Sequence, residues 1–108
     1  MRKLPAFVHH LCYFCDGWIV GSSANPRKRA PRDWDIIIPY TNWGQALAYL
    51  KEKNHSFSIN SFGGLKVYLS PITTVDIWPG DVGEYLKLGQ AQGAWHHKTN
   101  TRITKEPR

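Results

Sequence analysis

Three aspartates stand in stretches of sequence where acidic side chains are unusual. Asp33 and Asp35 lie two residues apart at the start of an apolar run, and Asp76 interrupts a second apolar stretch. Side chains two residues apart on a β-strand point to the same face, so Asp33 and Asp35 are expected to project together. A carboxylate beside a buried strand is costly unless a cation pairs with it, and Mg²⁺ prefers oxygen ligands. The pattern predicts a metal site for two-metal phosphoryl or nucleotidyl transfer; the alternative is that these aspartates mark strand ends and face water.

A glycine–serine pair, Gly21-Ser22, directly follows the first predicted strand. Glycine permits a tight turn and the close approach of a ligand to the backbone. Ser22 offers a backbone N–H and a hydroxyl to a phosphate, and a helical turn that starts there adds a favourable dipole. The pair is therefore a candidate phosphate-binding turn.

Together these residues resemble a known signature. Gly21-Ser22-Ser23-Ala24 followed by Asp33-Trp34-Asp35-Ile36 is similar to the motif of the minimal nucleotidyltransferases of the DNA polymerase beta-like nucleotidyltransferase superfamily, which reads Gly-Ser-x-Ala-Arg-Gly, five residues, Ser, then Asp-x-Asp. Val75-Asp76-Ile77 resembles the third acidic strand of that superfamily. The resemblance covers residues from about 5 to 90 and keeps the spacing of the motif throughout.

The resemblance implies the nucleotidyltransferase fold and the transfer of a nucleoside monophosphate from a nucleoside triphosphate, such as ATP, to a hydroxyl acceptor. In that reaction Asp33 and Asp35 are ligands of both Mg²⁺ or Mn²⁺ ions. Asp76 completes the site of the second metal and helps to deprotonate the attacking hydroxyl. Gly21 and Ser22 hold the triphosphate.

The chain departs from the signature at two places. Asn25-Pro26 stands where the superfamily has Arg-Gly, and Arg32 stands where it has Ser. Because Pro26 lacks an N–H and has a restricted φ, this loop cannot adopt the same turn. Arg27, Lys28 and Arg32 are assigned to nucleotide binding as replacement positive charge, although a run of charges is also typical of a solvated face.

The charge balance indicates anionic partners. The chain has 108 residues, and its 14 Lys and Arg against 8 Asp and Glu give a formal charge of +6. A chain of this length suits one domain. Positive charge favours RNA or protein over a cationic small molecule as the acceptor. The acceptor site would come from Lys66, the basic tail or another subunit.

Hydrophobic periodicity predicts an α+β fold, a small mixed β-sheet with helices packed on it. Residues 1–95 are predicted to form the nucleotidyltransferase-like domain, and residues 96–108 a basic, loosely ordered tail. A short helical turn is expected after Gly21, and capping boxes are expected at Asn42 and Asp81. The predicted elements are a helix over 5–15, strands over 18–20 and 34–38, a helix over 42–53, a hairpin of 57–60 and 65–69, a strand over 75–78 and a helix over 81–88.

The two cysteines, Cys12 and Cys15, could supply half of a zinc site, to be completed by histidines at positions 9, 10, 96 and 97. Their helical spacing with apolar neighbours favours buried thiols without zinc. No apolar run approaches the roughly 20 residues that span a membrane, so we expect a cytoplasmic protein without membrane association.

Two other classes of function stay open. The first is a catalytically weak nucleotidyltransferase-like binding protein, such as an antitoxin or an inhibitor, which the small size and the altered loop favour. Three intact aspartates count against it, because an inactive protein does not need costly buried acids. The second is a small nucleic-acid-binding module that uses Trp95 and the basic tail for stacking and phosphate contacts.

Overall fold

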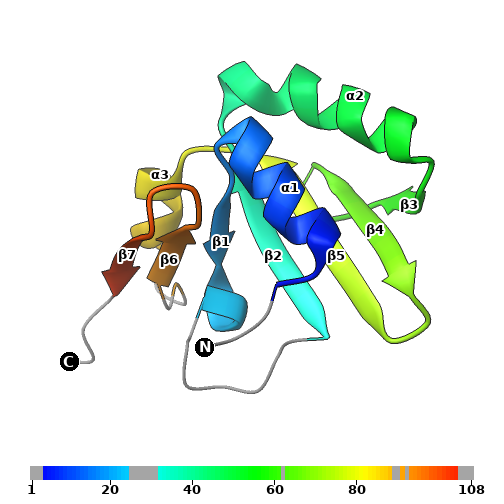
Figure 1. Ribbon diagram of the computed structural model, residues 1–108. Coiled ribbons are helices and arrows are strands. Elements are labelled where there is room, and N and C mark those ends of the chain that lie inside the picture. Colours follow the sequence, from blue (N-terminus) through cyan, green and yellow to red (C-terminus); the bar gives the residue numbers. More distant parts are fainter. Residues whose placement is uncertain (1–3, 25–31, 62, 89–90, 92, 105–108) are drawn as a thin grey trace.

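A mixed β-sheet organises the computed structural model, which describes residues 4–24, 32–61, 63–88, 91 and 93–104 (Figure 1). Within these residues the sheet has seven strands, in the order β3-β4-β5-β2-β1-β6-β7. The elements are α1 (Ala6–Cys15), β1 (Trp18–Val20), the 3-10 turn η1 (Gly21–Ala24), β2 (Asp33–Ile38), the 3-10 turn η2 (Tyr40–Asn42), α2 (Trp43–Lys53), β3 (Ser56–Ile59), β4 (Leu65–Ser70), β5 (Thr73–Pro79), α3 (Val82–Leu86), β6 (Gly93–His96) and β7 (Thr101–Thr104). The predicted α+β class and mixed sheet are confirmed, whereas the nucleotidyltransferase fold stays a prediction.

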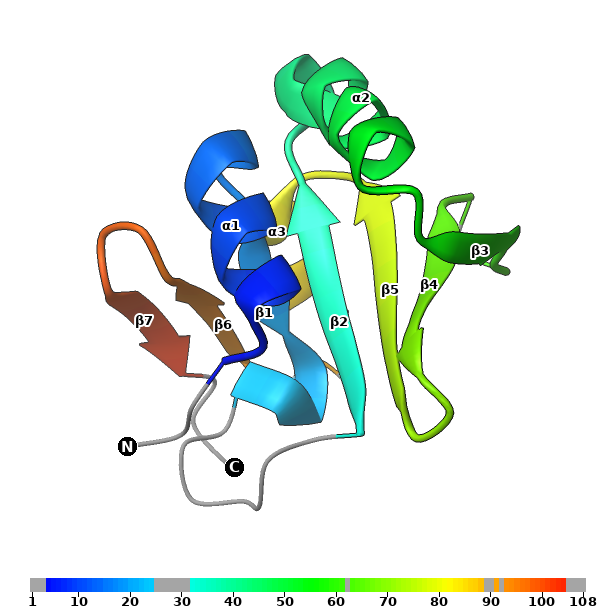
Figure 2. The same cartoon turned by 45° about the vertical axis from the view of Figure 1, so that its right-hand side comes forward.

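The centre of the sheet is the parallel pair of β2 and β5. The chain leaves β2 through α2, forms the antiparallel β3–β4 hairpin and then returns as β5, which lies antiparallel to β4 (Figure 2). On the other side of β2, β1 and β6 continue the sheet in antiparallel order. The predicted hairpin and the predicted helices and strands up to α3 are all present.

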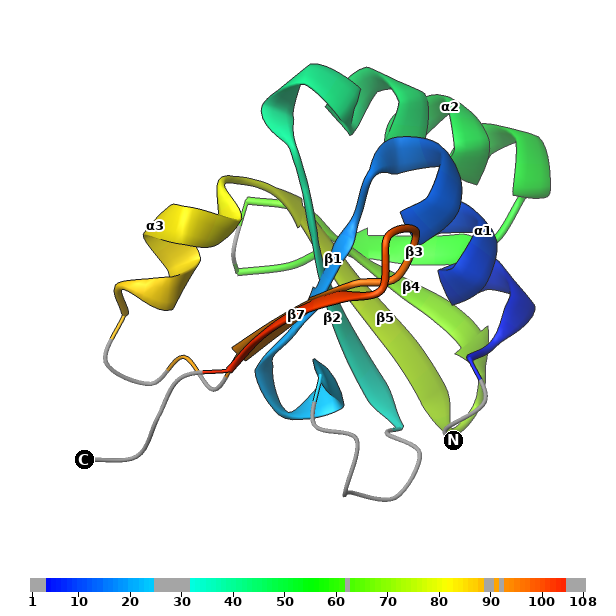
Figure 3. The same cartoon turned by 60° about the vertical axis from the view of Figure 1, so that its left-hand side comes forward.

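The two faces of the sheet are covered unequally. The helices α1 and α2 pack on one face, where Trp34, Ile36 and Ile38 of β2 join the main core. The short helix α3 packs on the opposite face over a smaller cluster that includes Val20 and Ile37 (Figure 3). Since side chains alternate along a strand, the odd-numbered residues of β2 point to the α3 face, where α3 is the one helix among the described residues.

Helix ends explain where several elements stop. Asp16 ends α1 in the left-handed conformation with φ 53°, which agrees with the end of the helix predicted over 5–15. The Asp81 carboxylate accepts the Glu84 N–H at 3.0 Å, which confirms one predicted cap. The predicted cap at Asn42 is wrong, because the Asn42 side chain donates to the Gln45 carboxamide at 2.7 Å and makes no bond to the backbone of α2.

The predicted loose tail is wrong for residues 96–104. Residues 93–104 form the β6–β7 hairpin, and β6 pairs with the edge of β1 so that Trp18 lies opposite His96. Trp95 is buried in the main core, its Nε1–H donates to Asn100 at 3.0 Å, and Arg102 lies over its ring at 4.1 Å. These contacts order residues 93–104 although the segment is rich in polar residues, because the polar residues belong to the hairpin turn. Residues 105–108 lie outside the described residues.

Cys12 and Cys15 are free thiols buried in the inner face of α1, as predicted. Burial raises the pKa of the Cys12 thiol far above its usual range, so the thiolate that binds zinc is disfavoured. Among the helices of the described ranges, none combines the length and the apolar character needed to cross a membrane.

Candidate active site

The register of β2 and β5 places Asp35 directly opposite Asp76. Adjacent strands lie about 4.8 Å apart, and paired residues project from the same face. Asp33 pairs with Thr74 one step earlier on that face. Asp33, Asp35 and Asp76 therefore lie on one face of the sheet, as strand alternation predicted for Asp33 and Asp35.

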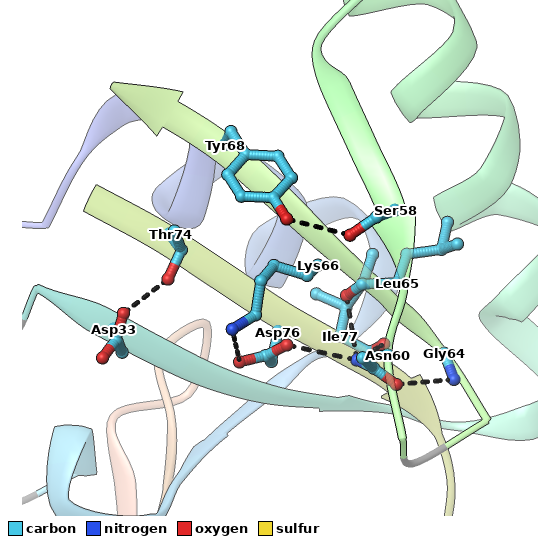
Figure 4. A network of polar contacts seen from close by, with 10 residues as sticks. All are labelled: Asp33, Ser58, Asn60, Gly64, Leu65, Lys66, Tyr68, Thr74, Asp76 and Ile77. Atoms are coloured by element: carbon cyan, nitrogen blue, oxygen red, sulfur yellow. Dashed lines mark hydrogen bonds and ion pairs between the residues drawn. The ribbon is translucent and has the colours of Figure 1, made fainter. Parts of the chain in front are cut away.

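Asp76 is the most buried of the three aspartates, with 8% of its surface exposed. Its Oδ2 lies 3.8 Å from the ammonium of Lys66, which neighbours it on β4. Its Oδ1 accepts a hydrogen bond of 3.3 Å from the Asn60 carboxamide (Figure 4). Asn60 is itself held by Gly64, whose N–H donates to the Asn60 Oδ1 at 2.9 Å. The Asp76 carboxylate thus has a cationic partner and a hydrogen-bond donor, which hold it in one orientation.

Asp33 has a different environment. It is exposed at the start of β2, and its Oδ1 accepts a hydrogen bond from the Thr74 hydroxyl on β5 (Figure 4). Within residues 4–24, 32–61, 63–88, 91 and 93–104, no three His, Cys, Asp or Glu side chains are grouped so that they could hold a metal ion. The opposed pair of Asp35 and Asp76 therefore forms the centre of the candidate site, and Asp33 lies beside this pair.

The negative charge of the pair formed by Asp35 and Asp76 is only partly compensated by Lys66. The pKa of Asp35 is raised from 3.8 to about 6, first by burial and then by the negative charges of Asp76 and Asp33. Lys66 opposes this shift but does not cancel it. A divalent cation would relieve the repulsion between Asp35 and Asp76, so the donor set suits a hard metal ion.

The glycine–serine turn lies against this pair. Gly21 ends β1 with φ +68°, and a Cβ added there would lie 3.3 Å from Oδ2 of Asp35. The buried hydroxyl of Ser23 donates to the Val20 carbonyl at 2.7 Å and accepts the Asp35 N–H at 3.3 Å. The turn is thereby tied to β2, while Ser22 is exposed beside it. A glycine at position 21 satisfies both the positive φ and the close approach.

Two residues of the site were not predicted from sequence. The Tyr85 hydroxyl lies 3.6 Å from the position that a Cβ on Gly21 would occupy. Burial and the negative charge of Asp35 raise the pKa of Tyr85, whereas a hydrogen bond with the Gly21 backbone lowers it. Asn60 reaches Asp76 from the turn after β3. The capping pattern at Asp81 predicted the helix that carries Tyr85 but not its packing, and nothing in the local sequence marks Asn60 as a partner of Asp76.

The structure describes only one of the three basic residues that were predicted to bind the nucleotide. Arg32 is exposed next to Asp33, and its carbonyl accepts the Thr74 N–H at 2.8 Å. Arg27 and Lys28 lie outside the described residues. Their assignment to nucleotide binding stays a prediction.

No protein-family model, no curated protein and no solved structure matches this chain.

Proposed function

We propose that the protein binds a nucleoside triphosphate with Mg²⁺ or Mn²⁺ and transfers its nucleotidyl group to a hydroxyl acceptor. The observation that carries this proposal is the opposed pair of Asp35 and Asp76, on adjacent parallel strands and beside the Gly21 turn. The resemblance of the Gly-Ser and Asp-x-Asp segments to the DNA polymerase beta-like nucleotidyltransferases supports the same chemistry.

The proposed binding of Mg²⁺ or Mn²⁺ depends on the two carboxylates of the site. Mg²⁺ is commonly held by one or two carboxylates together with substrate phosphates and water, which Asp35 and Asp76 can satisfy. Asp33 would join them by turning its side chain away from Thr74. Bound ions would supply stabilisation of the charge on the α-phosphate and on the leaving pyrophosphate.

The transfer step is a displacement at phosphorus. The acceptor hydroxyl oxygen forms a bond to the α-phosphorus, and the bond from this phosphorus to the oxygen that bridges to the β-phosphate breaks. Pyrophosphate leaves with that electron pair, and the hydroxyl proton passes to the Asp76 carboxylate. Lys66 and Asn60 favour this role because both contact Asp76 and orient its carboxylate.

The remaining parts of the substrate are assigned by charge and position. Gly21 and Ser22 would hold the triphosphate, and Arg32, Arg27 and Lys28 would add positive charge around it. The net charge of +6 favours an RNA or a protein as the acceptor.

A second candidate is a catalytically weak nucleotidyltransferase-like binding protein, of the antitoxin or inhibitor kind. The hydrogen bond between Asp33 and Thr74 favours it, because this bond keeps Asp33 out of the pair. The two candidates differ in one property, the appearance of a labelled acceptor.

The test is incubation of the protein with α-phosphate-labelled nucleoside triphosphates, Mg²⁺ or Mn²⁺, and RNA and protein from a cell extract. Wild type is compared with Asp35→Asn and with Asp16→Asn, a control at the C-cap of α1, at a left-handed position that Asn tolerates. Label should pass to an acceptor with wild type and Asp16→Asn, and not with Asp35→Asn. A wild-type protein that binds no triphosphate in a metal-dependent way would rule out the proposal.

A further inference from the structure

A cavity lies on the α3 face of the sheet, next to the paired aspartates. Its volume is about 360 Å³. Its lining includes Ile37, Tyr40, Trp78, Asp81, Glu84 and Tyr85.

The cavity lies next to the carboxylate pair along the two strands that carry it. Ile37 follows Asp35 by two residues on β2, and Trp78 follows Asp76 by two residues on β5. Each pair therefore shares a face, and the cavity begins about 6.6 Å further along the strands than the carboxylates. Tyr85 connects the two regions, because it lines the cavity while its hydroxyl lies beside Gly21.

The lining suits a flat, aromatic group. The rings of Trp78 and Tyr85 lie 6.5 Å apart at 52° to each other, and Tyr40, 72% exposed, adds a third ring. Aromatic side chains stack on any nucleobase, and a volume near the lower end of small-molecule pockets suits one such ring system.

The acidic residues of the lining indicate which end of the nucleotide lies in the cavity. Asp81 and Glu84 are both exposed, so carboxylates stand where an incoming phosphate would be repelled. Carboxylates accept hydrogen bonds from exocyclic amino groups of bases, as they do from cytosine in nucleic-acid recognition. The phosphates would therefore lie at the Gly21 turn and the base in the cavity.

We propose that this cavity is the nucleobase subsite and that it favours bases with an exocyclic amino group. This inference rests on the proposed function, because it assumes that the triphosphate binds at Asp35 and Asp76. It adds a base preference to that function and gives Tyr40, Trp78 and Glu84 roles in binding the substrate.

The experiment compares the affinities of the intact protein for three ligands, each with Mg²⁺: ATP, inosine triphosphate and tripolyphosphate, which has no base. Calorimetry should show ATP binding at least ~10-fold more tightly than tripolyphosphate, since stacking on aromatic rings strengthens binding. ATP should also bind several-fold more tightly than inosine triphosphate, which lacks the exocyclic amino group.

Two variants assign the effect to the cavity. Tyr40→Ala should weaken ATP binding about 5-fold and leave tripolyphosphate binding unchanged. The exposed Phe14→Ala, on α1 at the other face of the sheet, is the matched control and should change neither affinity. Glu84→Ala should abolish the preference for ATP over inosine triphosphate.

Equal affinity of wild type for ATP and tripolyphosphate would overturn the nucleobase subsite and leave the proposed function standing. A Tyr40→Ala variant that binds ATP as wild type does would also overturn it. Binding of neither ligand in the presence of Mg²⁺ would overturn both the subsite and the proposed function.

Discussion

Asp35 and Asp76 occupy directly opposed positions on the only parallel strand pair among the described strands, so two carboxylates project side by side from one face of the sheet. Lys66 compensates Asp76, and the pKa of Asp35 is still raised to about 6. The arrangement lowers the stability of the metal-free fold as pH rises from about 4 to about 6. Sites that violate the local rules of folding in this way are typically functional.

The first prediction separates stability from activity. Asp35→Asn removes a charge and keeps the side-chain shape, so the metal-free protein should gain about 1–2 kcal/mol in the free energy of unfolding at pH 8, less than the full pKa shift gives because solvent screens the pair. Transfer activity should fall by about 100-fold or more, because a ligand to the metal is lost. Urea unfolding without metal and labelled transfer with Mg²⁺ measure the two effects. An Asp35→Asn variant with wild-type transfer would remove Asp35 from the mechanism.

The second prediction concerns pH. The folded-state pKa of Asp35 is raised from 3.8 to about 6, so the folded state holds this proton more tightly than the unfolded state. The contribution of Asp35 to stability therefore declines as pH rises from about 4 to about 6 and is constant above that. The difference in unfolding free energy between Asp35→Asn and wild type should be near zero below pH 4 and should grow up to pH 6. A difference that is the same at every pH would contradict the assigned cause.

Local sequence patterns were sufficient to predict the elements up to α3. Apolar runs such as Ile36-Ile37-Ile38 have the periodicity of a buried strand, and Asp81 with Glu84 has the spacing of a cap. The strands β6 and β7 were missed because their stability comes from pairing with β1 and from the burial of Trp95. Contacts between residues so far apart in the chain leave no local signal.

The same limit applies to the site. Strand alternation predicted that Asp33 and Asp35 share a face, and the apolar surroundings of Asp76 indicated a second strand. The pairing of Asp76 with Asp35 and the hydrogen bond from Thr74 to Asp33 depend on the register of β2 with β5. Register is set by the packing of the whole sheet, so it could not be read from either strand alone.

A third prediction uses two glycines in opposite environments. A Cβ on Gly64 would lie 1.9 Å from the Ile77 carbonyl oxygen, whereas a Cβ on Gly44 in α2 would meet no atom within 4 Å. Gly64→Ala should destabilise the fold by about 3 kcal/mol or more, since the backbone of β5 must move. Gly44→Ala should stabilise it by about 1 kcal/mol through helix propensity. Chemical denaturation of both variants tests this, and a stable Gly64→Ala protein would contradict the packing of this turn.

A fourth prediction concerns the thiols. Cys12 and Cys15 have 0% and 1% of their surface exposed, and burial raises the pKa of both thiols. In native protein they should react with a disulfide reagent about 100-fold or more slowly than in denaturant, because reaction requires an opening of the fold. Elemental analysis should find no stoichiometric zinc. Rapid native labelling, or zinc at one ion per chain, would show that α1 does not bury these side chains as described.

The last prediction concerns Asn60, which joins the stability of the β3–β4 turn to the orientation of Asp76. Its carboxamide donates to the Leu65 carbonyl at 3.1 Å and to Asp76 at 3.3 Å, and its oxygen accepts the Gly64 N–H at 2.9 Å. Asn60→Ala leaves the buried Gly64 N–H without this acceptor, which should lower the free energy of unfolding by about 1–3 kcal/mol.

The same variant should weaken Mg²⁺–triphosphate binding by about 10-fold, because partners that orient a metal ligand contribute effects of this size. Asn42→Ala is the matched control, since the Asn42 side chain bonds to Gln45 at the start of α2, away from Asp76. It should change neither stability by more than about 0.5 kcal/mol nor metal binding. Affinities are measured at a temperature where both variants are fully folded, which removes the loss of stability from the comparison. If Asn60→Ala then binds Mg²⁺ and triphosphate as wild type does, Asn60 supports only the turn and does not position Asp76.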